Sequence, residues 1–260
     1  MIRKLTQSEF RTSSWSGGTT TQIAIFPPEA EYADRDFLWR VSSAAVELEE
    51  SDFTALPDYE RLISTLKGEI SLTHNGGAPL RLRPLEIHAF SGADATHSRG
   101  RCTDFNLMLR RGRVSGTMEA LRLTESPAPL RAGTSTPCPP PSPCETTLLY
   151  CVEGIASVGA AIGRPPEAPP SVGAAIGRPP EAPLSVGAVI GRPQPAPASQ
   201  SCHPERSAAE PKDPFLSAEP SAACPLPCTL SPGEALLLTE PAALTLTGPA
   251  VLMLCRMRVL

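Results

Sequence analysis

Residues 15–27 read WSGGTTTQIAIFP, a Gly-Gly pair followed by a run of mostly β-branched residues. Two glycines in series permit positive φ or a close backbone approach, so they suit either a tight turn into a strand or an anion-holding loop. No Lys-Ser or Lys-Thr follows them, as it would in a P-loop. We therefore predict an entry turn at Gly17 and Gly18, with Trp15 as a core plug and a strand over Thr19–Ile25.

Runs of β-forming residues recur along the chain between turn signals such as the Asn-Gly-Gly sequence at 75–77. In the first half they predict further strands over Phe37–Val46, Arg61–Leu66, Glu69–His74, Leu80–Leu82, Glu86–Phe90 and Thr103–Leu109. In the second half they predict strands over Thr229–Leu238, Ala243–Leu246 and Val251–Met257. The best short helical candidate, Val114–Leu123, has a weak helical pattern. The chain is therefore predicted to be all-β.

A Pro-rich repeat interrupts this pattern. The 14-residue unit SVGAAIGRPPEAPP begins at Ser157, recurs from Ser171 and returns slightly altered from Ser185. A unit with so few apolar side chains cannot bury enough surface to offset its conformational entropy. Residues 157–222 are therefore predicted to be a disordered low-complexity insertion, either a passive linker or a Pro-rich docking segment.

The two halves of the chain echo each other. Residues 62–71 (LISTLKGEIS) match 148–157 (LLYCVEGIAS), and residues 82–90 (LRPLEIHAF) match 230–238 (LSPGEALLL). This repetition predicts two β-barrels or sandwiches packed together, the insertion replacing a hairpin loop of the second. The predicted divisions are a first barrel over 1–123, a linker over 124–143, a second half over 144–156 and 223–260, and the insertion over 157–222.

Charge and composition exclude several classes of partner. The formal net charge of −4 gives no positive field to recruit nucleic acid or an anionic membrane. No apolar run reaches the roughly 18 residues of a membrane span, and the amino terminus lacks a signal-peptide stretch. The eight cysteines form no paired C-x-x-C motifs, so reduced thiols are the default. We expect a cytoplasmic protein, with a homodimer left open.

Four sequence blocks in order resemble the HutD/Ves family: WSGGTTTQIAIFP at 15–27, DFLWRVSSA at 36–44, FSGAD at 90–94 and DFNLM at 104–108. The resemblance covers about residues 1–112, and the repeat interrupts the family pattern in the second half. It implies a double cupin-like β-barrel (bicupin) fold and, for the HutD branch, a role in controlling bacterial histidine utilisation. The motif and structural positions are Trp15, Gly17, Gly18, Thr19, Trp39, Arg61, Gly68 and Gly92.

The histidines argue against a cupin metal centre. Metal-binding cupins place two histidines one residue apart so that their side chains converge on one ion. None of the four histidines here forms a His-x-His pair. Only His88, with Glu86 two residues before it on the same face, could contribute, and a half-exposed strand residue is the simpler interpretation. We therefore predict no metal and no other cofactor.

Strand alternation predicts a polar interior instead, because side chains two residues apart point the same way. The inward set expected in the first barrel is Gln22, Arg40, Ser42, His88, Asp104 and Asn106. Such a lumen could hold a small polar ligand, Arg40 offering a planar donor pair to a carboxylate. Alternatively, Arg40 pairs with Asp104 as a structural ion pair and the rest are a hydrogen-bonded core.

The sequence thus favours a small-molecule-binding, HutD/Ves-like cupin with a regulatory or stress-related role and no catalysis. One alternative is a metal-free isomerase-like enzyme acting on a small carboxylic acid with His88 or Glu86 as its base. Another is a degenerate structural relic. Nucleophilic catalysis finds no support, because Cys102 and Cys151 have no adjacent histidine and no Gly-x-Ser-x-Gly motif occurs.

Overall fold

The computed structural model describes residues 1–133, 145–161 and 223–260. All of these residues belong to one compact unit. They form strands and two short 3-10 helices, η1 (Gln7–Glu9) and η2 (Tyr32–Asp34), which confirms the all-β prediction. The predicted disorder and the repeats over 162–222 lie outside the described residues. No helix in the described part is long and apolar enough to cross a membrane.

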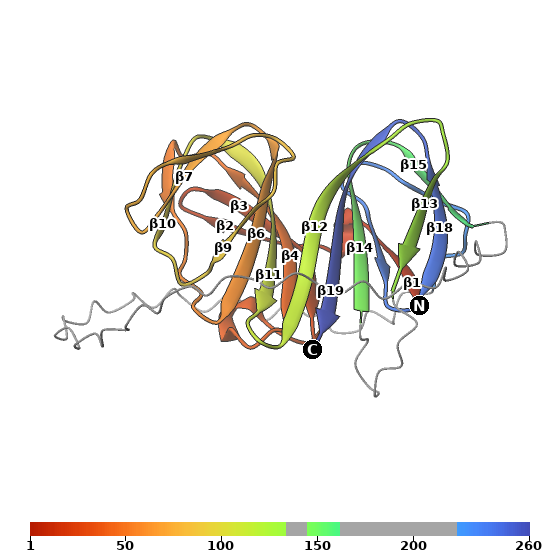
Figure 1. The fold of residues 1–260 in the computed structure, drawn as a ribbon, viewed down its shortest axis with the longest axis horizontal. Coiled ribbons are helices and arrows are strands. Elements are labelled where there is room, and N and C mark those ends of the chain that lie inside the picture. Colours follow the sequence, from red (N-terminus) through yellow and green to blue (C-terminus); the bar gives the residue numbers. More distant parts are fainter. Residues whose placement is uncertain (134–144, 162–222) are drawn as a thin grey trace, which may run out of the picture. The chain divides into compact units, whose positions relative to one another are not determined.

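Two antiparallel sheets form what we call the first sandwich (Figure 1). The six-stranded sheet has the order β2 (Arg11–Trp15), β3 (Gly18–Phe26), β4 (Trp39–Val46), β11 (Cys102–Arg110), β6 (Tyr59–Lys67) and β9 (His88–Ser91). The four-stranded sheet has the order β5 (Glu50–Asp52), β10 (Thr96–Arg99), β7 (Ile70–His74) and β8 (Leu80–Leu82). Apolar residues of both sheets, including Ile63, Leu72 and Phe90, form a core between them.

Two further sheets form the second sandwich. The five-stranded sheet has the order β1 (Ile2–Leu5), β17 (Ala235–Leu238), β14 (Glu145–Gly154), β19 (Ala250–Val259) and β12 (Val114–Leu123). The four-stranded sheet has the order β13 (Ala128–Ala132), β18 (Ala242–Thr247), β15 (Ala156–Ala160) and β16 (Cys228–Leu230). Leucines of both sheets, among them Leu149, Leu238 and Leu252, pack into a second core.

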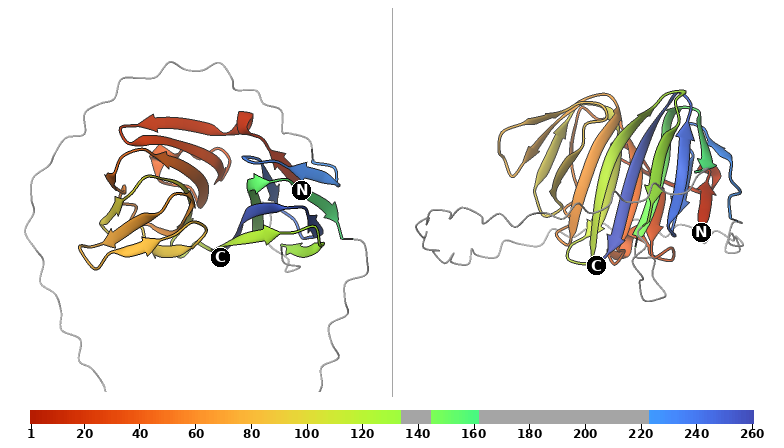
Figure 2. Two further views of the ribbon diagram at one scale, coloured as in Figure 1. Left: turned by 90° about the horizontal axis from the view of Figure 1, so that it is seen from above. Right: turned by 45° about the vertical axis from the view of Figure 1, so that its right-hand side comes forward.

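Several expected boundaries differ from the structure. The helical candidate Val114–Leu123 is the strand β12, because it pairs with β19 along its whole length, and the two strands run side by side in Figure 2. The predicted linker contains β13, and β15 continues to Ala160, past the predicted start of the insertion. The predicted strand Thr229–Leu238 is two strands separated by a turn at 231–234.

A third core joins the two sandwiches. It contains Phe105 and Leu107 of β11 from the first sandwich, and Leu148 and Met253 from the second. Phe105 and Leu148 are fully buried, and Trp39 in the same core stacks on Phe26 with ring centroids 5.7 Å apart. Because β11 buries alternate residues here, its other face is turned into the first sandwich.

The turn between β2 and β3 lies at the predicted place: Ser16 and Gly17 form it, and Gly18 is the first residue of β3, opposite Trp15. Gly18 has a φ of 144°, and a Cβ there would lie 1.9 Å from the carbonyl oxygen of Ala45, so only glycine fits. Trp15 is not a core plug, because its side chain is 40% exposed. Its indole packs over Gly17, where a Cβ would lie 2.1 Å from the ring. Gly17 therefore makes room for the indole at the surface, whereas Gly18 allows the close approach of β4.

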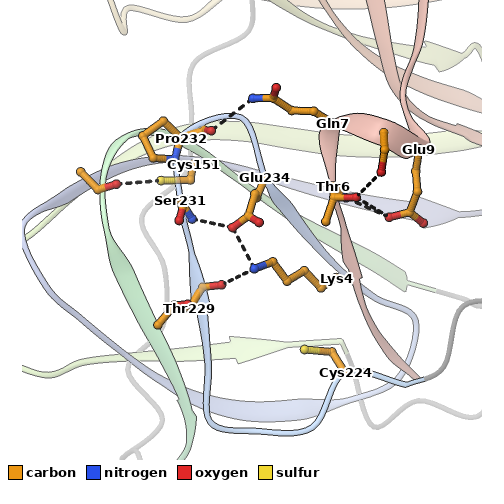
Figure 3. A network of polar contacts seen from close by, with 12 residues as sticks. Lys4, Thr6, Gln7, Glu9, Cys151, Cys224, Thr229, Ser231, Pro232 and Glu234 are labelled. Atoms are coloured by element: carbon orange, nitrogen blue, oxygen red, sulfur yellow. Dashed lines mark hydrogen bonds and ion pairs between the residues drawn. The ribbon is translucent and has the colours of Figure 1, made fainter.

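Within the second sandwich, a polar network fastens β1 to β16 and to the turn between β16 and β17 (Figure 3). Lys4 Nζ lies 2.8 Å from a carboxylate oxygen of Glu234 and donates to the Thr229 carbonyl at 2.9 Å. The backbone N–H of Ser231 donates to the same carboxylate. Burial alone would raise the pKa of Glu234, but Lys4 and the Ser231 N–H outweigh it and hold this pKa below its ordinary value. The Ser-Pro-Gly-Glu turn therefore carries the anchor for β1.

Candidate functional site

The first sandwich contains a cavity of about 290 Å³. Side chains from β2, β3, β4, β6 and β11 line it, together with residues around β5 and Tyr32 of η2. Its volume is close to the lower end of the range for small-molecule pockets, roughly 300–1,000 Å³. A small metabolite is therefore the class of ligand that fits.

Two central strands bring most of the predicted inward residues together. In the antiparallel register of β4 and β11, Ser42 lies opposite Asn106 and Ala44 lies opposite Asp104. Arg40 is two residues before Ser42, so it shares the same face. All five of these residues line the cavity.

Arg40 is held in place by neighbouring polar groups. Its Nε donates to Gln22 Oε1 at 2.8 Å, and one terminal nitrogen donates to Ser42 Oγ at 3.1 Å. The guanidinium also lies over the ring of Tyr32, 4.3 Å from its centroid. Burial lowers the pKa of Arg40, but the group stays charged at neutral pH. Gln22 does not line the cavity and acts as a support for Arg40.

Arg61 of β6 is a second buried guanidinium in the same cavity. It is 6% exposed, and its Nε has no hydrogen-bond partner in the part of the chain that the structure describes. Its guanidinium carbon lies 4.9 Å from the ring centroid of Phe53 and 5.1 Å from that of Phe90. Burial lowers the pKa of Arg61 to about 10, which still leaves it charged at neutral pH. Arg61, expected only as a motif position, is therefore a cavity residue.

Asp104 does not neutralise these arginines by a direct contact. Among the ion pairs of the described residues, none joins Arg40 or Arg61 to any carboxylate. The expected alternative of an Arg40–Asp104 pair is therefore wrong in this structure. Asp104 Oδ1 instead accepts the backbone N–H of Ala44 at 2.9 Å.

The buried charged groups of the cavity carry a net positive charge. Burial raises the pKa of Asp104 to about 6, against the opposing effects of the Ala44 N–H and the two arginines. At neutral pH the buried groups therefore comprise two guanidiniums and one carboxylate. Asn106 also lines the cavity and is 4% exposed, and its Oδ1 has no hydrogen-bond partner within residues 1–133, 145–161 and 223–260. The cavity is positively charged and has an unused acceptor.

His88 lies outside this cluster. In the register of β9 with β6, Phe90 lies opposite Arg61, while His88 lies opposite Ile63. His88 does not line the cavity, and its Nε2 is 2.8 Å from Nε2 of His74. Glu86, the other candidate base, is exposed and accepts the Arg83 N–H. Neither base expected for the isomerase alternative reaches the cavity.

A chain of hydrogen bonds fixes the tautomers of the two histidines. Thr96 Oγ1 donates to the Asp94 carbonyl, so it accepts from His74 Nδ1 at 2.8 Å. Neutral His74 then presents an unprotonated Nε2, which accepts from His88 Nε2. Nδ1 of His88 is therefore the nitrogen left to take up a proton.

The protonation of His88 predicts a pH dependence of stability. Burial, and secondarily His74, lower its pKa below the ordinary value of about 6.5. Because the unfolded chain then binds this proton more readily, the contribution is complete above about pH 6.5 and is lost as the pH falls below it. We expect an NMR titration of the His88 ring to give a midpoint below 6.5, and His88→Gln to reduce the loss of stability between pH 7 and pH 5.5. A midpoint above 6.5 would contradict this assignment.

The remaining motif positions are structural. Gly68 has a φ of 75° at the turn between β6 and β7, and a Cβ at Gly92 would lie 2.3 Å from the Leu56 carbonyl oxygen. Trp39 is buried in the core between the sandwiches, and Thr19 on β3 pairs with Ala45. No group of three or more His, Cys, Asp or Glu side chains in the described part of the chain is placed to hold a metal ion.

The aromatic wall of the cavity was not expected from the sequence. Trp15, Tyr32 and Phe53 all line it, from β2, from η2 and from the segment after β5. Phe53 and Tyr32 lie outside the predicted strands, so no alternation pattern pointed to them. Their only signal was the presence of a large aromatic residue in a polar loop.

Comparisons with known proteins agree with this architecture. The family model described as HutD matches residues 7–164. Similar solved structures include PA5104 of Pseudomonas aeruginosa PAO1, with TM-score 0.60, 19% identity and coverage of 99% of this chain and 98% of that one.

Two further structures have the same fold. HutD of Pseudomonas fluorescens SBW25 has a TM-score of 0.58 and 17% identity, with 98% of each chain covered. The bacterial pirin YhhW of Escherichia coli, in complex with nickel(II), has a TM-score of 0.54 and 9% identity, with 100% of each chain covered. No curated protein matches the chain. At these identities the structural likeness shows the fold alone.

Proposed function

Since this chain belongs to the HutD family, we propose that it is a cupin-like protein that binds a small carboxylate ligand in the first sandwich. Its role is regulatory and not catalytic, in keeping with the resemblance to the HutD branch and its association with histidine utilisation. The two sandwiches are, in this proposal, the two barrels of a bicupin, and the ligand site belongs to the first.

The observation that carries the proposal is the buried guanidinium of Arg61, which pairs with no carboxylate among the described residues and whose Nε has no hydrogen-bond partner there. A buried charge without a partner costs several kcal/mol, so proteins rarely leave one in place for stability alone. A carboxylate in the cavity would supply the missing partner, since a planar guanidinium can bind it through two parallel hydrogen bonds. Arg40, already oriented by Gln22 and Ser42, supplies a second cationic group without reorganisation.

The proposed role without catalysis has its own support. The bases expected for an isomerase, His88 and Glu86, do not line the cavity. A binding protein needs only a shaped, charged and partly apolar pocket, and the cavity combines two arginines with aromatic walls.

A ligand screen on the full chain tests this proposal. We expect acids of histidine degradation to raise the melting temperature, and the matching neutral amides to leave it unchanged, because only the acids neutralise the cavity. Isothermal titration then gives Kd for the best acid. The proposal fails if no acid stabilises the protein more than its amide does.

Arg40→Ala is expected to weaken binding of that acid about tenfold, the equivalent of about 1.4 kcal/mol. The loss is partial because Arg61 remains, and the fold should survive because Arg40 takes part in no ion pair. Titration and circular dichroism of the variant measure the two effects. The control Arg99→Ala removes an exposed arginine paired with Glu50 and should change neither. An unfolded Arg40→Ala chain would support the purely structural interpretation.

A further inference from the structure

Asp104 is the buried acidic group of the cavity. The other carboxylate in its lining, Asp52, has a side chain that is 86% exposed and lies 2.8 Å from His97 Nδ1. Asp104 is 8% exposed, and the Ala44 N–H occupies its Oδ1. Its Oδ2 has no hydrogen-bond partner among the described residues. This oxygen is therefore available to the cavity and to whatever binds there.

The groups that face Asp104 come from several elements. Arg40 on β4 and Arg61 on β6 are the cationic ones, and both favour the charged carboxylate. Cys102 precedes it by two residues on β11, and burial raises the pKa of that thiol to about 12, so it is neutral. Tyr32 of η2 lies on the guanidinium of Arg40.

The histidines of β7 and β9 do not line the cavity. Among the buried groups that line the cavity, Asp104 is therefore the one that gains or loses a proton between pH 5 and pH 8. Burial raises its pKa to about 6, close to the middle of that interval.

An anion entering this cavity meets Asp104 as well as the arginines. A second negative charge a few ångströms from a carboxylate disfavours the ionised form, whereas a protonated carboxyl can donate a hydrogen bond to the anion. Repulsion is thereby replaced by an attractive contact. The cost of taking up the proton at neutral pH is small, about 1.4 kcal/mol, because the pKa of the carboxyl lies only about one unit below pH 7.

We propose that the cavity binds its anion together with one proton, which Asp104 takes up from solvent and donates to the anion through Oδ2. The proton adds to the carboxylate, so the bound state carries a neutral carboxyl between two guanidiniums. This inference rests on the proposed anion site and adds its regulation, since binding weakens as the pH rises above about 6.

Nitrate is a suitable probe, because it is a planar oxyanion like a carboxylate but takes up no proton itself in this pH range. We expect its affinity for the full chain to fall as the pH rises from 6 to 8, approaching tenfold per pH unit at full coupling. Calorimetry at pH 7 in Tris and in bis-tris, which differ in ionisation enthalpy, counts the protons directly. The two enthalpies should differ by the amount that corresponds to proton uptake.

Asp104→Asn should remove the coupling. The amide keeps an acceptor for the Ala44 N–H and presents a permanent donor, so nitrate should bind more tightly than to the parent at pH 8 and without proton uptake. The control Asp58→Asn changes an exposed carboxylate outside the cavity and should retain the pH dependence of the parent. If Asp104→Asn does not fold, the number of protons taken up by the parent on nitrate binding, measured in the two buffers, still tests the inference.

Two results would overturn the inference, and they are distinguishable. Nitrate or carboxylate binding that is independent of pH and of the buffer would refute proton coupling and leave the anion site intact. Absence of binding by either class of anion at every pH from 5.5 to 8 would refute the coupling and the proposed function together.

Discussion

Arg61→Met is expected to weaken anion binding roughly 30-fold or more and to leave the unliganded protein at least as stable as its parent. Burial lowers the pKa of Arg61 from its ordinary value to about 10, which corresponds to a cost of about 3 kcal/mol for keeping the charge at neutral pH. Methionine has a similar length, removes that cost and retains apolar contact with Phe53 and Phe90. Some of the gain is offset because the cation–π contacts are lost.

Binding should respond far more strongly to this change than to Arg40→Ala. The Nε of Arg61 has no hydrogen-bond partner among the described residues, so this buried donor is available to the ligand. A charged hydrogen-bonded pair in a buried site is worth about 2–5 kcal/mol, a loss of roughly 30-fold or more in affinity. If Arg61 is there to bind a ligand, Arg61→Met should make the unliganded protein more stable and at the same time weaken anion binding.

Urea denaturation and calorimetric titration of the same preparation measure both effects. Arg81→Met, on an exposed arginine of β8 paired with Glu69, is the matched control and should leave both quantities within about 0.5 kcal/mol. An Arg61→Met chain that loses several kcal/mol of stability would mean that Arg61 supports the fold. The argument for a missing anionic partner would then fail.

Period-two alternation within a strand accounts for most of what the sequence could predict about the site. It placed Arg40, Ser42, Asp104 and Asn106 on faces that the structure gathers around one cavity. The requirement is local, since neighbours two residues apart share a face whatever the partner strand is.

The failures have non-local causes. The register of β3 with β4 shifts between Gln22 and Ala24, so Ala24 and Phe26 pack into the core between the sandwiches, and simple alternation breaks down. His88 was misplaced because its position relative to Arg61 depends on how β9 pairs with β6. Neither a bulge nor a pairing register can be read from one strand alone.

The sequence also did not predict that the first half contributes strands to the second sandwich, because strand pairing is non-local. β1 and β12 belong to the first 123 residues but pair with β17 and β19. An edge of a sheet and its partner can lie more than a hundred residues apart, and the apolar pattern of β12 fits a weak helix as well as a strand. The similarity between segments of the two halves predicted two similar sandwiches. It gave no sign that the first half contributes strands to the second sandwich.

Leu148→Ala is expected to lower the free energy of unfolding by about 3–5 kcal/mol, although Leu148 lies in the second sandwich and far along the chain from the ligand cavity. It is fully buried in the core that joins the sandwiches, together with Phe105 and Met253. Removal of three buried carbon atoms leaves a cavity that the two flanking sheets cannot fill without shifting against each other. Leu80→Ala, on a leucine that is 39% exposed, is the control and should cost less than about 1 kcal/mol.

The same variant distinguishes one folding unit from two. Trp39 of β4 is 2% exposed and faces the shared core, whereas Trp15 is at the surface, so the fluorescence of a Trp15→Phe chain reports on the face of the first sandwich that contacts the second. Far-ultraviolet circular dichroism reports on the strands of both. Because β1 and β12 cross between the sandwiches, we expect both signals to move together to lower urea in Leu148→Ala. A Trp39 transition that stays in place while the circular dichroism shifts would show that the first sandwich, with its cavity, is stable without the second.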